Sequence, residues 1–414
     1  MGGGGRIGAV SCASAPRLPF PSPPARRNAA PMRLLLILLL WASGLGAAAQ
    51  FAKVGLILPE LSRLYPDWSL GPMVSAISLV GIVLGLVAGV LAAGWGFKRV
   101  LVGSLALGAA VSFAQAAGLS TGWMLASRVV EGAAHLGIVV AAPTLIAALA
   151  PERWRGAAMT LWGTFFGVAF AAVAWAGLPL AQARGPEALW LWHGLFMALA
   201  ALVLLAALPR EEARPVRLRA GEVWRRHREA WSSPWTAAPA AGWLFYTFTF
   251  VALASVLPGT VAAADRAFVA GAMPLASIAS SMTLGVWLLA RVGAVRVVEL
   301  GFVLAAATVV LLAFLPGSVW LPVLLFAALG LVQGASFAAV PELVASDRER
   351  ALANGAMAQA GNTGNAVGTP VLLFAVATGG FGFAMGLVAL CLAGGLAAHL
   401  LLRRVRAAGA PSAA

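Results

Sequence analysis

Among the ionisable side chains inside long apolar stretches of this 414-residue sequence, Lys53, Arg128, Glu131 and His135 are the candidates for chemistry. A charge within a membrane-spanning segment is costly, so each of the four is a candidate functional group. Arg128, Glu131 and His135 are three and four residues apart, a spacing that places them on one face of a helix. Arginine stays protonated and binds carboxylates through two nitrogens, so this face could bind an anion. Glu131 or His135 could carry a proton, because histidine titrates near neutral pH.

The same four residues also fit purely structural roles. Lys53 could extend its long side chain to the outer membrane surface, as lysine does near helix ends. Arg128 and Glu131 could form an ion pair that only fixes helix packing, and His135 could hydrogen-bond a neighbouring helix. The residues alone leave the functional and the structural interpretation open.

A second group of candidates consists of uncharged polar residues in the later apolar stretches. Its members are Tyr246, Gln333, Gln359, Asn362 and Asn365. Amides within a membrane can bind a ligand or can hydrogen-bond between helices, and both roles stay open here. Asn362 and Asn365 are three residues apart and share one helix face.

The composition excludes a soluble fold and several classes of function. Hydrophobic residues make up 61% of the chain, charged residues make up 10%, and the mean hydropathy is +0.91. Soluble domains are about a quarter charged. Cys12 and Cys391 provide no disulfide framework or thiolate metal site, and the four histidines are scattered. Because no nucleotide-binding loop or metal-ligand cluster is present, we expect no cofactor, no metal and no enzymatic activity.

Apolar stretches long enough to cross a bilayer core, about 20 residues each, recur along the chain. They predict an all-α membrane protein with twelve transmembrane helices in two six-helix halves. The predicted spans are 34–58, 71–94, 100–119, 123–149, 157–181, 188–208, 236–257, 267–290, 298–315, 320–344, 353–378 and 381–402.

Basic residues are distributed unevenly between the gaps that separate these spans. Alternate gaps, together with the central linker and the tail, contain 18 Lys and Arg residues, whereas the other gaps contain only Arg63, Arg184 and Arg266. Positively charged loops stay in the cytoplasm, so both termini are predicted to be cytoplasmic. The net charge of +14 thus reflects topology, and we expect no nucleic-acid partner. An arginine-rich, lysine-poor composition favours a bacterial source and hence the inner (cytoplasmic) membrane.

The gaps also divide the chain into segments. We expect residues 1–31 to be a disordered leader or the result of a start codon placed too early. The remaining segments are an N-terminal half (32–208), a basic cytoplasmic linker (209–235), a C-terminal half (236–406) and a cytoplasmic tail (407–414).

The two halves repeat each other in sequence. Lys98 corresponds to Arg296 at an offset of 198 residues, and Arg155 corresponds to Arg350 at an offset of 195. Six spans in each half give both halves one orientation, as in transporters whose halves rock about a midplane site.

Two motifs resemble those of the major facilitator superfamily. The segment from Gly89 to Arg99 is similar to the family's loop between spans 2 and 3, but Ala93 stands where the family has an acidic residue. Arg128 followed by Gly132 is similar to the family's motif in span 4. The resemblance covers nearly all of the chain after residue 32.

The resemblance implies roles for two sets of residues. Spans 1, 4, 7 and 10 line the central cavity of this family, which would place Lys53 and Arg128 at matching depths beside that cavity. A cationic cavity attracts anions. The loop residues implied to take part in conformational change are Gly89, Gly96, Lys98 and Arg99, with Arg291 and Arg296 as their counterparts in the second half.

We therefore expect a secondary active transporter of a small solute that works by alternating access, as a monomer in the lipid bilayer. Proton-coupled uptake of a small anion is the first choice, since span 5 lacks the Gly-Pro pair of the family's drug/proton antiporters. Efflux of a drug or metabolite on the same fold is an alternative. A transport-inactive membrane receptor or scaffold is an alternative of another class.

Overall fold

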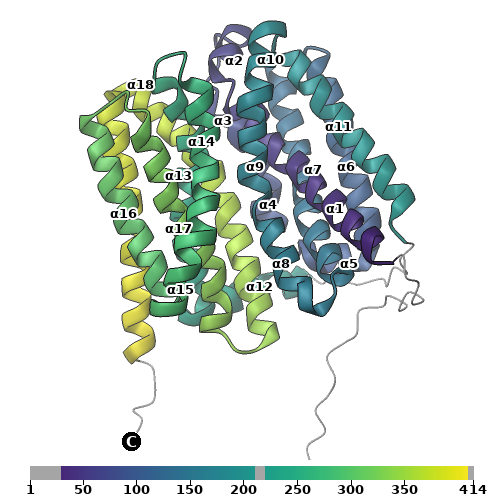
Figure 1. The fold of residues 1–414 in the computed structure, drawn as a ribbon, viewed down its shortest axis with the longest axis vertical. Helices are drawn as coiled ribbons and strands as arrows, with labels where there is room; N and C mark the ends of the chain where they lie inside the picture. The colour runs from purple at the N-terminus through teal and green to yellow at the C-terminus, as the bar shows by residue number, and fades with distance from the viewer. Residues whose placement is uncertain (1–28, 210–219, 409–414) are drawn as a thin grey trace, which may run out of the picture.

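The computed structural model describes residues 29–209 and 220–408. Most of the expected leader (1–31), part of the linker (210–219) and most of the tail (407–414) lie outside the described residues. Within the described ranges the regular structure is helical and contains no strand. Figure 1 shows two bundles side by side, one from purple to teal and one from green to yellow.

The N-terminal bundle contains the first eleven α-helices. Their bounds are α1 Ala29–Gly55, α2 Leu58–Leu64, α3 Gly71–Ser75, η1 Ala76–Ser78, α4 Leu79–Leu84, α5 Ala88–Trp95, α6 Phe97–Ala116, α7 Thr121–Leu149, α8 Glu152–Gly163, α9 Phe165–Ala172, η2 Val173–Gly177, α10 Leu178–Arg184 and α11 Pro186–Ala207.

The linker helix and the C-terminal bundle make up the rest. Their bounds are α12 Ala220–Ser232, α13 Pro234–Val256, η3 Leu257–Thr260, α14 Arg266–Ser280, η4 Ser281–Gly285, α15 Val286–Val292, α16 Ala294–Phe314, α17 Trp320–Leu343 and α18 Asp347–Ala408. Pro186 and Pro234 each occupy the first position of their helix, where a missing backbone N–H costs nothing.

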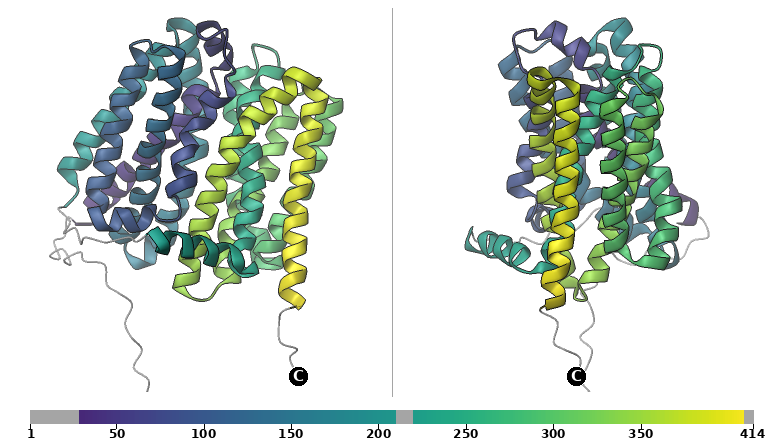
Figure 2. Two further views of the ribbon diagram at one scale, coloured as in Figure 1. Left: turned by 180° about the vertical axis from the view of Figure 1, so that it is seen from behind. Right: turned by 90° about the vertical axis from the view of Figure 1, so that its left-hand side faces the viewer.

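The helix α18 contains two spans. Its 62 residues would extend about 93 Å as one helix, three times the thickness of a bilayer core. Gly380 interrupts it with φ 76°, a backbone conformation that favours glycine. Figure 2 shows the yellow chain turning back on itself there, so that two arms, 347–379 and 381–408, run antiparallel.

The predicted span count agrees with this architecture. Within residues 29–209 and 220–408, ten helices are long and apolar enough to cross a membrane. Gly71–Leu84 and Ala88–Trp95, bent by 77° at their break, add an eleventh when the pair is counted as one span. Counting the two arms of α18 separately gives twelve. The structure therefore confirms the fold class of two six-helix halves, with most boundaries within a few residues of those predicted.

The two halves that repeat in sequence also repeat a close contact between helices. In the first half, a Cβ on Gly132 would lie 2.2 Å from the carbonyl oxygen of Ile77, so only glycine permits this approach of span 4 to span 2. In the second half, a Cβ on Gly330 would lie 2.1 Å from the carbonyl oxygen of Ser277. The close approach thus recurs at an offset of 198 residues.

The loop arginines follow the same repeat. Arg155 donates from Nε to the carbonyl oxygen of Ala147 at 3.1 Å, and Arg350 donates from Nε to that of Val344 at 3.0 Å. Each arginine thereby binds the free carbonyl end of the preceding span, where a cation is favourable.

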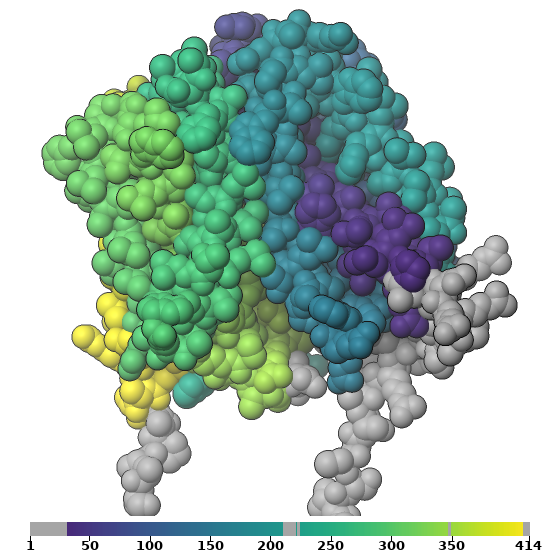
Figure 3. Space-filling view, viewed as in Figure 1, coloured from purple at the N-terminus to yellow at the C-terminus, as the bar shows by residue number. Residues whose placement is uncertain are grey.

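The two bundles meet along two seams. Span 5 packs on span 8, with the Gly167 backbone against Pro274 and Ile278, and span 2 packs on the first arm of α18, with Gly71 against Pro370. Figure 3 shows the teal and green surfaces in contact over the upper part of this face and a hollow between the bundles lower down. The largest buried apolar cluster extends from α1 to α18 and joins both bundles.

Candidate substrate and coupling site

The Lys53 side chain lies at the centre of a buried polar group inside the N-terminal bundle. Its Nζ is 2.7 Å from Oε1 of Glu131 on α7 and donates to Oγ of Ser112 at 2.7 Å and to Oε1 of Gln115 at 2.8 Å, both on α6. All four side chains are buried. Lys53 is therefore fully paired, which does not fit an extension to the outer membrane surface.

The Arg128 side chain completes this group. Its Nη1 bonds Oε2 of Glu131, one turn along α7, and its Nε donates to the carbonyl oxygen of Met73 in span 2 at 2.8 Å. Its Nη2 is buried and has no hydrogen-bond partner within residues 29–209 and 220–408. Two cations thus share one carboxylate, and the group has one positive charge in excess.

The imidazole of His193 supports the same group from α11. Its Nε2 lies 3.0 Å from the carbonyl oxygen of Gly46, which can only accept, so Nε2 must carry the proton. In a neutral ring Nδ1 then accepts from the Ser112 hydroxyl at 2.8 Å. That hydroxyl, in turn, is oriented to accept from Lys53. Sequence reasoning missed His193, because a lone histidine in an apolar span shows no pattern.

The third member of the predicted helix face lies apart from this group. His135 pairs through Nδ1 with the carbonyl oxygen of Ala47 at 3.0 Å, and its ring packs edge-on against Phe51 at 5.1 Å. These contacts join α7 to α1, so His135 forms a hydrogen bond between two helices in this conformation.

An aromatic chain connects the two bundles next to the polar group. It begins at Phe51, whose ring packs against His135, one turn along α7 from Glu131, and it ends on α13 in the other bundle. Successive ring centroids are 5.9 Å apart from Phe51 to Phe166, 6.0 Å to Phe250, 5.3 Å to Tyr246 and 4.6 Å to Trp243. Of these rings only Tyr246 was predicted as a site residue, because the chain is assembled from distant segments.

The predicted amides are dispersed over the C-terminal bundle. Gln333 accepts from Ser277 at 3.2 Å, which joins α17 to α14. Gln359 bridges two other elements, because its Oε1 accepts from the Trp231 indole at 3.1 Å and its Nε2 donates to the carbonyl oxygen of Ile82 at 3.2 Å.

Asn362 and Asn365 lie further along the same arm of α18. Asn362 donates to its own helix at Ala358 and lies against Gly81 of span 2, so it is part of the seam between the bundles. The Asn365 Oδ1 is buried without a partner among the described residues. The structure thus does not gather the amides around Lys53 and Arg128.

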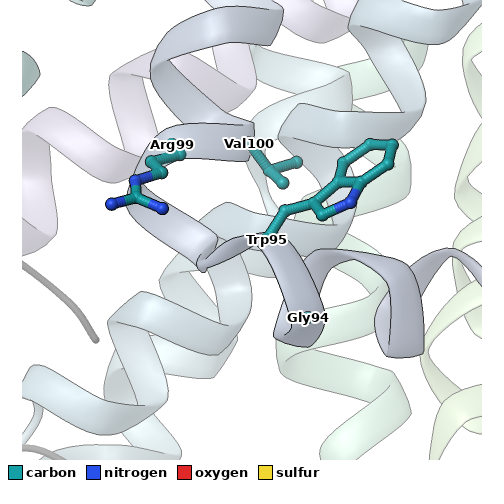
Figure 4. Close-up of a pocket in the computed structure, with 4 residues that line it drawn as sticks. All are labelled: Gly94, Trp95, Arg99 and Val100. Carbon is teal, nitrogen blue, oxygen red and sulfur yellow. The ribbon is translucent and has the colours of Figure 1, made fainter. Parts of the chain in front are cut away.

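The loop between spans 2 and 3 follows α5, at the same end of the molecule as the last turns of α18 (Figure 1). Lys98 donates to the carbonyl oxygen of Leu208, the end of span 6. Arg99 and Trp95 point to opposite sides of a hollow lined also by Gly94 and Val100 (Figure 4).

The remaining loop candidates take other positions. Gly89 has open space around it, Arg296 is exposed, and the Arg291 guanidinium lies 3.9 Å above the Trp287 ring. In the corresponding loop of the second half, it is Glu342 that binds the start of the next span. Its carboxylate accepts from the backbone N–H of Ala294 at 2.5 Å.

Most of the sequence matches a known family. A sequence profile described as Major Facilitator Superfamily matches residues 35–346, well over half of the chain. The chain belongs to the major facilitator superfamily. It is therefore a multi-pass membrane protein of a transporter family, and its candidate ligand is a small solute.

Curated relatives match part of the chain. The 4-hydroxybenzoate transporter PcaK of Pseudomonas aeruginosa is 35% identical over 190 residues, 44% of this chain and 40% of that protein. The niacin transporter NiaP of Acinetobacter baylyi is 32% identical over 135 residues, 31% of each chain. The aligned segment thus spans less than half the length of these relatives.

Two solved structures share the fold. A bacterial homologue of the human lysosomal transporter Spinster, inward-facing and unoccupied, has a TM-score of 0.67 and 16% identity over 93% of this chain and 99% of its own. FucP in the outward conformation has a TM-score of 0.63 and 17% identity over 90% of this chain and 99% of its own.

Proposed function

We propose that this protein takes up a small aromatic carboxylate by alternating access, coupled to a proton. The observation that carries the proposal is the adjacency of the buried Lys53–Arg128–Glu131 group and the aromatic chain that begins at Phe51. Together they offer an excess positive charge for a carboxylate and ring faces for an aromatic body. The aromatic acids in the names of the 4-hydroxybenzoate and niacin transporters are of the same chemical class.

Charge balance supports coupling to a proton. Removing the counter-ion of a buried charge is strongly unfavourable. Protonation of Glu131 would leave Lys53 and Arg128 without a carboxylate, and a substrate carboxylate would replace it. The proton and the anion would therefore favour each other's binding, and the net charge of the group would return to its starting value.

Access to this group requires movement, since its side chains are buried in this conformation. The aromatic chain crosses from one bundle to the other, so a rocking motion of the bundles would open it. A ligand shifts the balance between the two states only if it binds them with different affinity. A substrate that contacts Phe166 from one bundle and Phe250 from the other would meet this condition.

The proposed orientation places both termini and the arginine-rich loops in the cytoplasm, with the protein in the inner membrane of a bacterium. The last turns of α18, together with α12 and α5, lie at one end of the molecule (Figure 1). The positive-inside rule assigns this end to the cytoplasm. Uptake is the proposed direction, and efflux by the same fold is the competing outcome.

Ligand stabilisation of the purified protein tests the substrate class. Benzoate should raise the unfolding temperature, because a ligand that binds only the folded state stabilises it. Cyclohexanecarboxylate lacks the aromatic ring and benzyl alcohol lacks the charge, so both should have a much smaller effect. Phe250→Leu should remove the preference for benzoate, whereas Phe314→Leu, an exposed site on α16, should retain it. Equal stabilisation by all three compounds would contradict the proposal.

A further inference from the structure

The linker helix α12 (Ala220–Ser232) has an unusual combination of aromatic and basic residues on one face. At about 100° per residue, Trp224, Arg228 and Trp231 fall within a sector of about 60°, with the arginine between the two indoles along the helix axis and at one edge of the sector. The Trp224 side chain is 71% exposed, and Arg228 is exposed as well. Arg225 lies further round the helix and pairs with Glu229 at 3.7 Å.

The position of α12 matches a membrane surface. Figure 2 shows it as a teal helix near the lower ends of the spans, lying across them and projecting beyond the outline of the bundle. Exposed tryptophans also lie at the same ends of three spans, namely Trp95, Trp235 and Trp287. Tryptophan concentrates at the membrane interface, where its ring meets the acyl boundary and its N–H meets water.

The far end of α12 is held firmly by the protein. Ala230 is buried, its carbonyl oxygen accepts from Thr236 at 2.7 Å, and the Trp231 indole donates to Gln359. Gln359 also bonds Ile82 across the seam between the bundles. The helix is therefore attached at residues 230–231, while the turn around Trp224 extends away from the attachment.

We propose that α12 is an interfacial helix that binds anionic phospholipid headgroups through Arg228 while Trp224 enters the acyl boundary. A helix with an aromatic face and flanking arginines lies in the plane of the interface, and its binding strengthens with anionic lipid. Charge complementarity selects the occupant, since Arg228 provides a cation between two rings that favour the headgroup level. The consequence is a lipid contact connected through Gln359 to the seam where the bundles move.

Hydrogen–deuterium exchange of the full chain in nanodiscs tests this surface. Backbone amides of residues 220–229 should exchange more slowly in nanodiscs that contain phosphatidylglycerol than in nanodiscs of pure phosphatidylcholine. One arginine near an anionic surface corresponds to about a fivefold change in binding. Arg228→Gln should therefore remove most of the difference between the two lipids. Arg404→Gln, which removes one exposed arginine at the same end of the molecule, should retain it.

A second variant separates the two contributions. Trp224→Ala should weaken protection in both lipids, since it removes the apolar contact and leaves the charge. Equal protection of wild-type α12 in the two lipids would overturn the proposal, because apolar insertion alone would then explain it. Exchange that is fast in both lipids would also overturn it, since the helix would then lie off the membrane and be open to a protein partner.

Discussion

At the scale of single residues, the main feature is a carboxylate shared by two buried cations. Glu131 pairs with both Lys53 and Arg128, and the Lys53 ammonium group donates its other hydrogen bonds to Ser112 and Gln115. Removing one partner of such a group leaves an uncompensated buried charge, which is more costly than losing the attraction itself. The residues that orient Lys53 should therefore affect stability, and Glu131 should affect coupling.

Ser112→Ala should lower the free energy of unfolding by about 1–3 kcal/mol. The variant removes one acceptor of Lys53 and leaves His193 Nδ1 with only the long contact to Lys53 Nζ at 3.5 Å, and an unpaired buried polar group costs about that much. Chemical unfolding in detergent measures the change. Ser62→Ala, an exposed serine that bonds only its own helix, should change stability little. Equal effects at the two positions would show that the Ser112 bonds contribute nothing.

Glu131→Gln should abolish the accumulation of substrate but retain the exchange of substrate across the membrane. The amide cannot take up and release a proton, so a pH gradient should no longer drive net uptake, while exchange of substrate across the membrane continues. Both rates can be measured with radiolabelled substrate in proteoliposomes, and Glu131→Asp provides the control that retains the carboxylate. Accumulation by the Gln variant at the wild-type level would show that Glu131 does not carry the coupling proton.

At the scale of helices, the close approach of spans 2 and 4 depends on a missing side chain. Gly132 faces the backbone of Ile77 at a distance that a Cβ atom does not tolerate, and Gly330 faces Ser277 in the same way. Small residues at such contacts let helix backbones pack closely in lipid. The repeat of this contact in both halves explains why the glycines occur at matching positions.

Gly132→Ala should lower the unfolding temperature, because the added methyl group forces α7 away from span 2. The matched control is Gly122→Ala on the same helix, where a Cβ would have nothing within 4 Å. In a helix, alanine is favoured over glycine by about 1 kcal/mol, so the control should be neutral or stabilising. An equal decrease at both sites would contradict the close approach.

The sequence predicted the elements better than it predicted the site. Apolar length and loop arginines are local signals, and they sufficed for twelve spans in two halves. The pairing of Lys53 with Glu131 joins residues 78 positions apart, and His193 comes from a third helix, so no local pattern reveals either contact. For Asn362 and Gln359 the sequence left ligand binding and helix contact both open, and in the structure both side chains contact span 2. Helix periodicity predicts which residues share a face, but it does not predict which helix packs against that face.

At the scale of the whole molecule, transport by rocking requires the seams between the bundles to open. Near one end of the span 2–α18 seam, a Cβ on Gly355 would lie 3.3 Å from Leu86 Cδ2 and 3.6 Å from Leu86 Cα. Such proximity allows a disulfide between cysteines at the two positions. The seam can thus be locked without altering the polar group.

The double variant Leu86→Cys/Gly355→Cys, with Cys12 and Cys391 replaced by serine, should lose transport when oxidised. Reduction should restore transport, because the cross-link prevents separation of the two bundles at that end. The Leu86→Cys single variant in the same background controls for oxidation. Full transport by the completely cross-linked protein would contradict a rocking motion at this seam.

The central claim is that a buried cationic group beside an aromatic chain carries an aromatic carboxylate together with a proton. Uptake of radiolabelled 4-hydroxybenzoate into proteoliposomes under an imposed pH gradient tests it most directly. The account predicts saturable accumulation driven by the gradient, its loss in Lys53→Met and Arg128→Met, and its retention in Arg404→Gln. Accumulation that is unchanged in both Lys53→Met and Arg128→Met would contradict the claim.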